Sequence, residues 1–432
     1  MRSRFVRAVG WLGGGKAIGL LAGLLSTSLI THIGGIRVAA LYFLALSVVA
    51  VAGTLAQLGS DVTVIPHLAR KDEASQAKRS AVLRRVLGTI SLAAALPAGL
   101  LLLPAVGDAL SGVAPDGFLA ACSPWLSLWI VARALQLGAS ACFRALESFR
   151  QSVLPAEVFP VIASMLGLVV LAATGHFTIE TVLAAFALPA TAASMWAWWS
   201  LLRAHRAPPQ ASGTSAGLMT GALWVWGIQV LHLIILQSDL WVVSWGTTDA
   251  DLAQYGVAMR LSLLAAVPLG FVVAIVAPRI ARATCRDDVA ALESQLRSAA
   301  FIAALPVAAA LLALVAFGGP AISLLFGAGF ADAQQTAMVL VLGQLANACF
   351  GVCGLVLLLR GDAPVQFMLT LVAAALNVIG GVLVVSRFGS LGVAWVACGT
   401  LVLTNVSMYG LVRARHGLNT WLKPSLNREL FR

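Results

Sequence analysis

A succession of apolar segments, each long enough to cross a bilayer, runs through nearly the whole sequence and decides what it can fold into. These segments lie near residues 11–31, 38–60, 83–104, 117–143, 155–175, 178–202, 217–245, 251–278, 298–319, 333–359, 364–386 and 390–412. In lipid every backbone amide must be paired internally, so only helices or a closed barrel can span. Barrel strands read as alternating segments of about 10 residues, whereas a spanning helix needs about 20 apolar residues. The pattern therefore predicts an all-α membrane protein with about 12 transmembrane helices.

The composition points the same way. The chain has 432 residues, of which 60% are hydrophobic and only 10% charged, whereas a soluble domain carries about 25% charged residues. The basic N-terminus, with Arg2, Arg4 and Arg7, resembles a secretory signal. The apolar run behind it is too long, however, and has no small-x-small cleavage site, so it is predicted to be an uncleaved first span.

The basic residues predict the orientation of these spans. Of the 28 Lys and Arg residues, 23 fall in segments on one side, two (Arg37 and Arg387) on the other, and three inside spans. Because Lys and Arg collect on the cytoplasmic side, we expect a multi-pass bacterial inner-membrane protein with both termini in the cytoplasm. The net charge of +11 follows from the same bias. These short basic loops face anionic lipid headgroups, so no nucleic-acid partner is expected.

The sequence offers little for soluble chemistry. Its six cysteines lie mostly in apolar runs and form no paired CxxC or His cluster, so no metal site or cofactor is expected. There is also no glycine-rich nucleotide loop of the Walker type, and the loops are short. We therefore predict that the protein is not an enzyme.

Weak internal similarity suggests that the chain consists of two halves. Tyr42 matches Tyr255 in an Ala-x-Tyr-x-x-Ala pattern, and Gly117-Phe118 matches Gly329-Phe330 at nearly the same offset. Six spans in each half make these parallel repeats. The predicted organisation is an N-terminal six-helix lobe (1–203), a cytoplasmic linker (204–216), a C-terminal six-helix lobe (217–413) and a cytoplasmic tail (414–432).

The second half also carries a family resemblance. The segments concerned are Leu325–Phe330, Leu342–Asn347, Leu359–Gly361 and Ser386–Ala394. They resemble the polysaccharide-biosynthesis and O-antigen-type flippases of the multidrug/oligosaccharidyl-lipid/polysaccharide (MOP) exporter superfamily. The resemblance implies two six-helix lobes around a central cavity, as in MATE-like proteins, and alternating access. It also implies a polyprenyl-diphosphate-linked oligosaccharide as cargo, and polysaccharide polymerase and ligase machinery as partners.

Charges inside the spans are the candidates for binding this cargo, because an intramembrane charge is costly and usually functional. Arg133, Gln136, Ser140 and Arg144 lie on one face of the fourth span at helical spacing. Guanidinium groups offer paired donors to phosphate oxygens, which suits a diphosphate moving along a wet wall. The alternative is that Arg133 neutralises an acid on a neighbouring helix and that Arg144 extends to the headgroups. The remaining cargo candidates are Lys16 and Arg260.

Asp61, His232 and Asp239 are the candidates for binding a coupling ion. Asp239 and Arg260 lie at similar depth below the outer end of the hairpin formed by spans 7 and 8, so a structural ion pair between them is the alternative. His232 could relay protons or simply hydrogen-bond a neighbouring helix.

Three functions remain open at this point. The leading one is a flippase for a lipid-linked oligosaccharide, in contact with membrane lipids. A multidrug or cation antiporter would need a cavity dominated by acids, whereas the deep charges here are three bases against Asp61 and Asp239. A membrane-embedded glycan polymerase would need long outer loops with catalytic clusters, and these loops are short.

Overall fold

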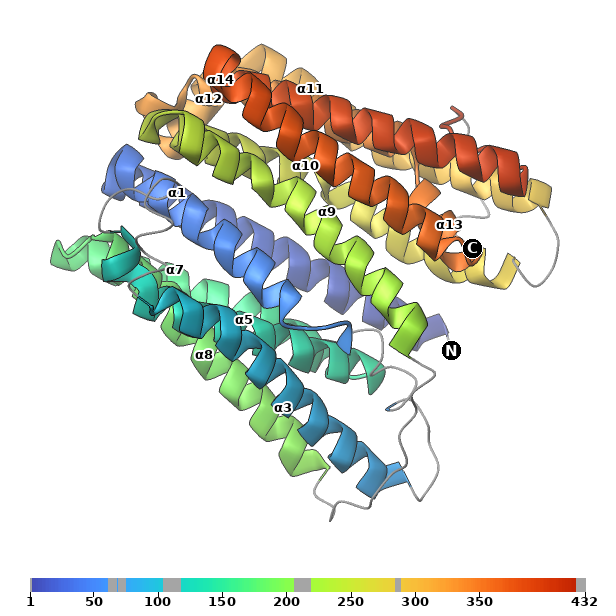
Figure 1. Ribbon diagram of the computed structural model, residues 1–432, viewed down its shortest axis with the longest axis horizontal. Helices are drawn as coiled ribbons and strands as arrows, with labels where there is room; N and C mark the ends of the chain where they lie inside the picture. Colours follow the sequence, from blue (N-terminus) through green and yellow to red (C-terminus); the bar gives the residue numbers. More distant parts are fainter. Residues whose placement is uncertain are drawn as a thin grey trace. The chain divides into compact units, whose positions relative to one another are not determined.

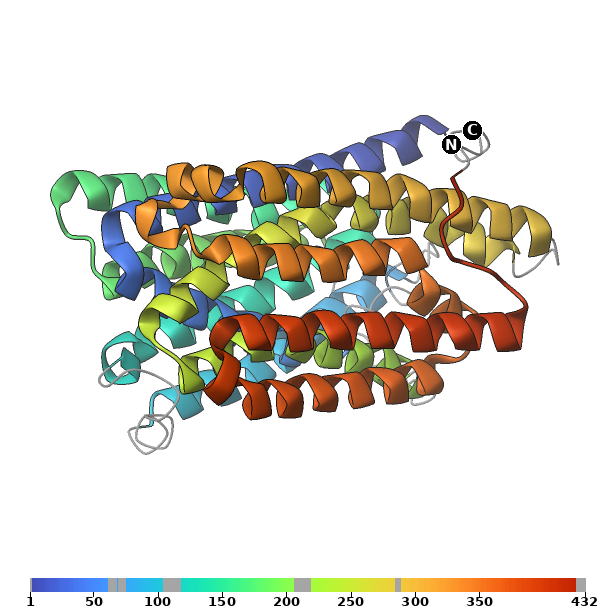
Figure 2. The same cartoon turned by 90° about the horizontal axis from the view of Figure 1, so that it is seen from above.

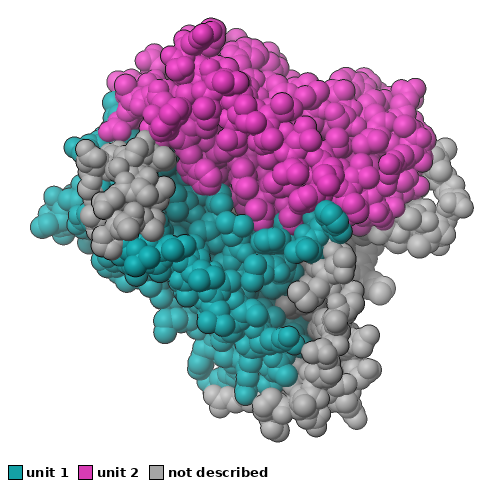
Figure 3. Space-filling model, in the orientation of Figure 1, with its two compact units in different colours: residues 1–226 teal, residues 227–432 magenta. Residues whose placement is uncertain are grey.

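The computed structural model describes residues 2–60, 68, 75–103, 118–205, 219–283 and 289–424, and the chain divides into two compact units. Unit 1 is Met1–Trp226 and unit 2 is Gly227–Arg432 (Figure 3). Most of the predicted linker, residues 206–216, lies outside the described residues. The domain limits drawn from the sequence therefore stay predictions.

Unit 1 is a bundle of long helices with one irregular stretch. Its elements are α1 (Arg2–Leu55), α3 (Ser75–Leu101), α5 (Phe118–Ala145), α6 (Phe149–Val153), the π-helix η1 (Leu154–Val158), α7 (Phe159–Thr174) and α8 (Ile179–Ala204). Helix α5 is central, because it packs against α1, α3 and α8. Buried Leu83, Ile90, Phe143 and Trp198 fill the space between α3, α5 and α8. The Trp198 indole N–H also donates to the carbonyl of Leu135 at 3.0 Å.

Unit 2 is also helical. It contains α9 (Met219–Gly246, which begins before the unit boundary), α10 (Asp249–Ala283), α11 (Val289–Phe326), the short 3-10 turn η3 (Ala328–Phe330), α12 (Ala333–Phe350), α13 (Cys353–Leu359) and α14 (Ala363–His416). Here α12 is central and packs against α10, α11 and α14. Helix α10 begins at a capping box in which Thr248 and Asp251 exchange hydrogen bonds between side chain and backbone.

The helices confirm the all-α membrane fold predicted from the apolar segments. Within the described ranges, nine helices are long and apolar enough to cross a membrane, or ten if α12 and α13, bent by 48°, count as one span. Two of these helices, α1 and α14, have 54 residues each and contain a break, at Gly35 and Gly389. Counting their two limbs separately turns ten spans into twelve, so the structure is compatible with the predicted number.

Both breaks rest on glycines in a conformation that other residues avoid. Gly35 has φ 69° and ψ −169°, and Gly389 has φ 59° and ψ −154°. The sequence predicted loops of several residues here, between 31 and 38 and between 386 and 390. The structure instead reverses each helix at a single glycine, and α1 and α14 each fold back on themselves (Figures 1 and 2). This backbone region is essentially restricted to glycine.

Replacing Gly389 with Ala is therefore expected to lower the free energy of unfolding by about 1–3 kcal/mol. A methyl group there would meet no atom within 4 Å, so the effect would come from the backbone alone. Gly399→Ala is the matched control, because Gly399 also has open space but lies in regular helix. It should be neutral or slightly stabilising. Thermal unfolding in detergent would measure both, and equal midpoints would contradict the expectation.

Candidate functional site

A buried carboxylate, that of Asp239, lies in the interior of unit 2. Asp239 in α9 is 7% exposed. Its carboxylate accepts a hydrogen bond from the Tyr255 hydroxyl of α10 at 3.0 Å and one from the Asn377 side-chain amide of α14 at 2.7 Å. Three helices therefore meet at this carboxylate. Asp239 lies seven residues before the end of α9, and Tyr255 six residues after the start of α10. At 1.5 Å per residue both lie about 10 Å from the turn that joins the helices.

Asn377 holds this cluster to α9. Besides Asp239, its amide nitrogen lies 3.1 Å from the Ile235 carbonyl and 3.3 Å from the Ser238 hydroxyl. The Asn377 side chain therefore makes hydrogen bonds between α14 and α9. The side-chain oxygen of Asn377 is buried and has no hydrogen-bond partner. Among the described residues, the cluster therefore contains a carboxylate without a cationic partner and an Asn377 oxygen without a hydrogen-bond donor. Burying such groups costs free energy.

The ion pair considered between Asp239 and Arg260 is absent, which corrects that alternative. Among the described residues the ion pairs are Arg297–Glu293, Arg415–Asp362 and His416–Asp362. Arg260 follows Tyr255 by five residues, so it points about 140° away around α10. Asp239 and Arg260 lie at similar depth in their helices, but they do not pair, because Tyr255 occupies the face of α10 that meets Asp239. Arg260 itself is half-buried.

A cavity of about 210 Å³ lies elsewhere in unit 2, lined by α9, α10, α12, α14 and the α12–α13 bend. His232 lines it, two turns before Asp239 on nearly the same face of α9. The wall formed by α14 carries Gln366, Thr404 and Asn405.

Several donors in this wall are already used. The Thr404 hydroxyl donates to the Thr400 carbonyl at 2.7 Å, and the Asn405 amide to the Leu401 carbonyl at 2.9 Å. The side-chain oxygen of Gln366, a residue only 8% exposed, has no partner. The Gln366 oxygen is therefore an acceptor without a partner in the lining of the cavity.

In unit 1 the candidate Arg133 of α5 binds a backbone carbonyl. Its guanidinium donates to the Ala156 carbonyl in η1 at 3.2 Å. In a regular helix that carbonyl would accept from residue 160, but Pro160 has no N–H. The stem of Arg133 lies against Gly53 of α1, where an added Cβ would be 3.1 Å from it. A proline thus frees the carbonyl, and a glycine makes room for the arginine that binds it.

Arg133 has no acidic partner in the part of the chain that the structure describes, so it does not neutralise an acid there. One of the five guanidinium donors makes the bond to Ala156, and the half-buried side chain has no other hydrogen-bond partner among the described residues. This leaves donors for an anionic ligand.

The other cargo candidates of unit 1 make contacts of their own, which do not involve Arg133. Gln136 is 3% exposed and donates to the Ala190 carbonyl of α8 at 3.1 Å. Arg144 is exposed at the end of α5 and donates to the Ser140 hydroxyl at 3.2 Å. The backbone of Lys16 lies in α1. Its side chain and the whole of Asp61 lie outside the described residues.

Comparisons with known proteins show the fold. No protein-family model and no curated protein matches the chain. Among solved structures, the chain is similar to "Lipid II flippase MurJ, inward closed conformation", with a TM-score of 0.71 and 14% identity over 92% of this chain and 86% of that one. It is also similar to an inward-facing "multidrug resistance MATE family transporter of the MOP superfamily", with a TM-score of 0.76 and 15% identity over 95% and 98% of the two chains. The MATE multidrug transporter DinF-BH gives 0.66 and 15%, over 97% and 95%. The chain therefore has the fold of these membrane proteins.

Proposed function

We propose that the protein is a flippase that carries a polyprenyl-diphosphate-linked oligosaccharide, a precursor of surface polysaccharide, across the inner membrane by alternating access. The cargo has an anionic diphosphate and a polar glycan, which must pass the hydrocarbon while the prenyl chain stays in lipid. A transporter for it needs fixed cationic donors at membrane depth. The solved structure named as a lipid II flippase has the same fold, which supports a lipid-linked cargo.

Arg133 is the observation that carries this proposal. It is half-buried, has no acidic partner among the described residues, and keeps donors beyond the one that binds Ala156. An unneutralised guanidinium inside a membrane protein is costly. It matches the geometry of phosphate oxygens better than a lysine would. Arg133 would bind the diphosphate, and Lys16, Gln136, Arg144 and Arg260 stay separate candidates for other contacts with the cargo.

Asp239 would bind the coupling ion. Its carboxylate is buried, held by Tyr255 and Asn377, and unpaired with any cation in the described ranges. Such a group can exchange a proton or a monovalent cation as access to it changes. His232 and Asp61 are the further candidates for this role.

The second candidate function is a multidrug or cation antiporter. The same Asp239 favours it, because a buried carboxylate can also hold an organic cation, and two of the similar structures are named as multidrug transporters. Neither function requires a cofactor.

Deletion of the gene separates the two functions. If the protein is the flippase, lipid-linked glycans should accumulate in the deletion strain and surface polysaccharide should fall, and a plasmid copy should reverse both. Efflux of cationic dyes should be unchanged. Normal levels of every lipid-linked glycan, together with lost dye efflux, would exclude the flippase and favour the antiporter.

A further inference from the structure

The chain does not leave unit 2 where α14 ends. Gly417, with φ 65°, ends the helix, and residues 417–424, which we call the C-terminal strap, turn back across the unit. Leu418 and Thr420 are fully buried. A short polar segment this well covered is part of the packed structure.

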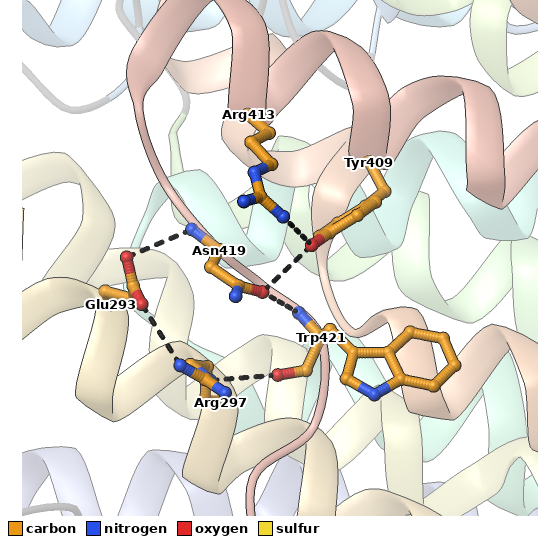
Figure 4. Close-up of polar contacts among 6 residues, drawn as sticks. All are labelled: Glu293, Arg297, Tyr409, Arg413, Asn419 and Trp421. Atoms are coloured by element: carbon orange, nitrogen blue, oxygen red, sulfur yellow. Dashed lines mark hydrogen bonds and ion pairs between the residues drawn. The ribbon is translucent and has the colours of Figure 1, made fainter.

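Side chains of α11 and α14 fix the strap along its length (Figure 4). The Asn419 backbone N–H donates to Glu293 at 3.2 Å, and Arg297 donates to the Trp421 carbonyl at 3.2 Å. The Tyr409 hydroxyl donates to the Asn419 side chain at 3.2 Å. The strap therefore ties the beginning of α11 to the end of α14.

A second set of contacts holds both sides of the bend between α12 and α13. On the α12 side, the Leu422 N–H donates to the Cys349 carbonyl at 3.0 Å. On the α13 side, the Thr420 hydroxyl and the Cys353 thiol lie 2.9 Å apart. The Trp421 ring packs edge-on against Phe350, with centroids 4.7 Å apart. These contacts join the strap to both helices of a pair that is bent by 48°.

The bend turns at Gly351, which has φ 73°. An added Cβ there would lie 3.2 Å from the Thr420 carbonyl, so the strap rests directly on this glycine. Gly351 and its neighbours Val352 and Gly354 also line the cavity that contains His232, whereas no strap residue does. The bend thus contacts the strap and also forms part of the cavity wall.

We propose that the C-terminal strap is a latch on the α12–α13 hinge, and that its release lets α13 swing and changes the width of the cavity. Moving α12 would disturb its packing against three long helices, α10, α11 and α14. The seven-residue α13 packs mainly against α14 and begins two residues after Gly351, so less packing changes when it moves. The strap hydrogen-bonds residues on both sides of that hinge, Cys349 of α12 and Cys353 of α13. The proposal does not depend on which cargo the protein carries.

The end of α14 has its own anchor, so the strap can be released without losing the helix. Asp362, in the turn before α14, accepts from Arg415 at 2.6 Å and from His416 at 2.8 Å. Partial burial acts to raise the pKa of Asp362, but the hydrogen bonds from His416 and Arg415 hold it below its usual range. The carboxylate therefore stays charged at neutral pH, and its contribution is lost only as the pH falls through that lowered pKa.

A disulfide can close the latch reversibly. Thr420→Cys, with Cys353 kept and the other five cysteines replaced by Ser, puts two thiols where the hydroxyl and thiol now lie 2.9 Å apart. Hydrogen–deuterium exchange would be measured at the amides of residues 350–356, with α5 as the reference. The oxidised protein should exchange several-fold more slowly at the hinge than the reduced one. Thr420→Cys with Cys353→Ser should not respond to oxidant.

Variants that release the strap should increase hydrogen–deuterium exchange at the hinge. Asn419→Ala and Trp421→Ala remove contacts of the strap and should raise exchange at the hinge several-fold. Lys423→Ala is the control on the strap, because its contact with Arg297 is made by the backbone. No change at the hinge in both the locked and the opened proteins would overturn the proposal. Because no cargo is used, that result would leave the flippase function untouched.

Discussion

Arg133→Ala is expected to abolish export while the protein stays inserted and abundant. The substitution removes the guanidinium that we propose as the diphosphate ligand, and each hydrogen bond to a charged group contributes about 1.5–3 kcal/mol. Losing such bonds reduces transport by at least about tenfold. Surface polysaccharide and accumulated lipid-linked glycan would be measured in a deletion strain that carries the variant. Arg84→Ala, which removes the same charge from an exposed site on α3, is the matched control.

Loss of export in Arg133→Ala could also follow from loss of the hydrogen bond to the Ala156 carbonyl, and a second variant separates this effect from cargo binding. Pro160→Ala supplies the missing N–H for the Ala156 carbonyl, so it should replace the structural contribution of Arg133. If Arg133 serves only to satisfy that carbonyl, Pro160→Ala would restore export to Arg133→Ala. We expect no rescue, because the diphosphate ligand would still be missing. Normal surface polysaccharide in Arg133→Ala itself would exclude the cargo role altogether.

The sequence was most informative about features that repeat along the chain. Spans were predicted from apolar runs that lipid requires, and most helix ends agree within a few residues, as for α8 and α9. Gly35 and Gly389 lie within the predicted loops. Hydropathy does not depend on backbone angles, so it could not show that a single glycine reverses each helix. Prolines did contain usable information, since Pro160 identifies the carbonyl that Arg133 binds.

Features built from contacts across the fold were beyond the sequence. Asp239 was recognised as a charge inside a span, and Arg260 was considered as its partner from depth alone. The angle around α10 selects Tyr255 instead. Nothing in the C-terminal strap has a helical period or an apolar run. That this segment is packed against the unit becomes visible only in the structure, where Leu418 and Thr420 are fully buried.

Asp239→Asn is expected to remove the dependence of transport on its coupling ion. Asparagine has nearly the same shape and can still accept from Tyr255, but it cannot bind a proton or balance a cation. Asp239 has no cationic partner among the described residues, and an unpaired buried charge is costly, so a neutral side chain of the same shape should let the variant fold and insert. Transport would be measured in proteoliposomes under imposed proton or sodium gradients. The wild-type protein should respond to one of these gradients and the variant to neither.

Two further variants make that result specific to the carboxylate. Asp332→Asn makes the same chemical change at an exposed site with no capping bond, and it should keep the full response. Tyr255→Phe removes one donor to Asp239 but leaves the carboxylate, so it should shift the ion concentration needed for half-maximal transport without removing the response. If Asp239→Asn keeps the wild-type response, the cluster of Asp239, Tyr255 and Asn377 only joins α9, α10 and α14. The coupling site would then have to be sought at His232 or Asp61.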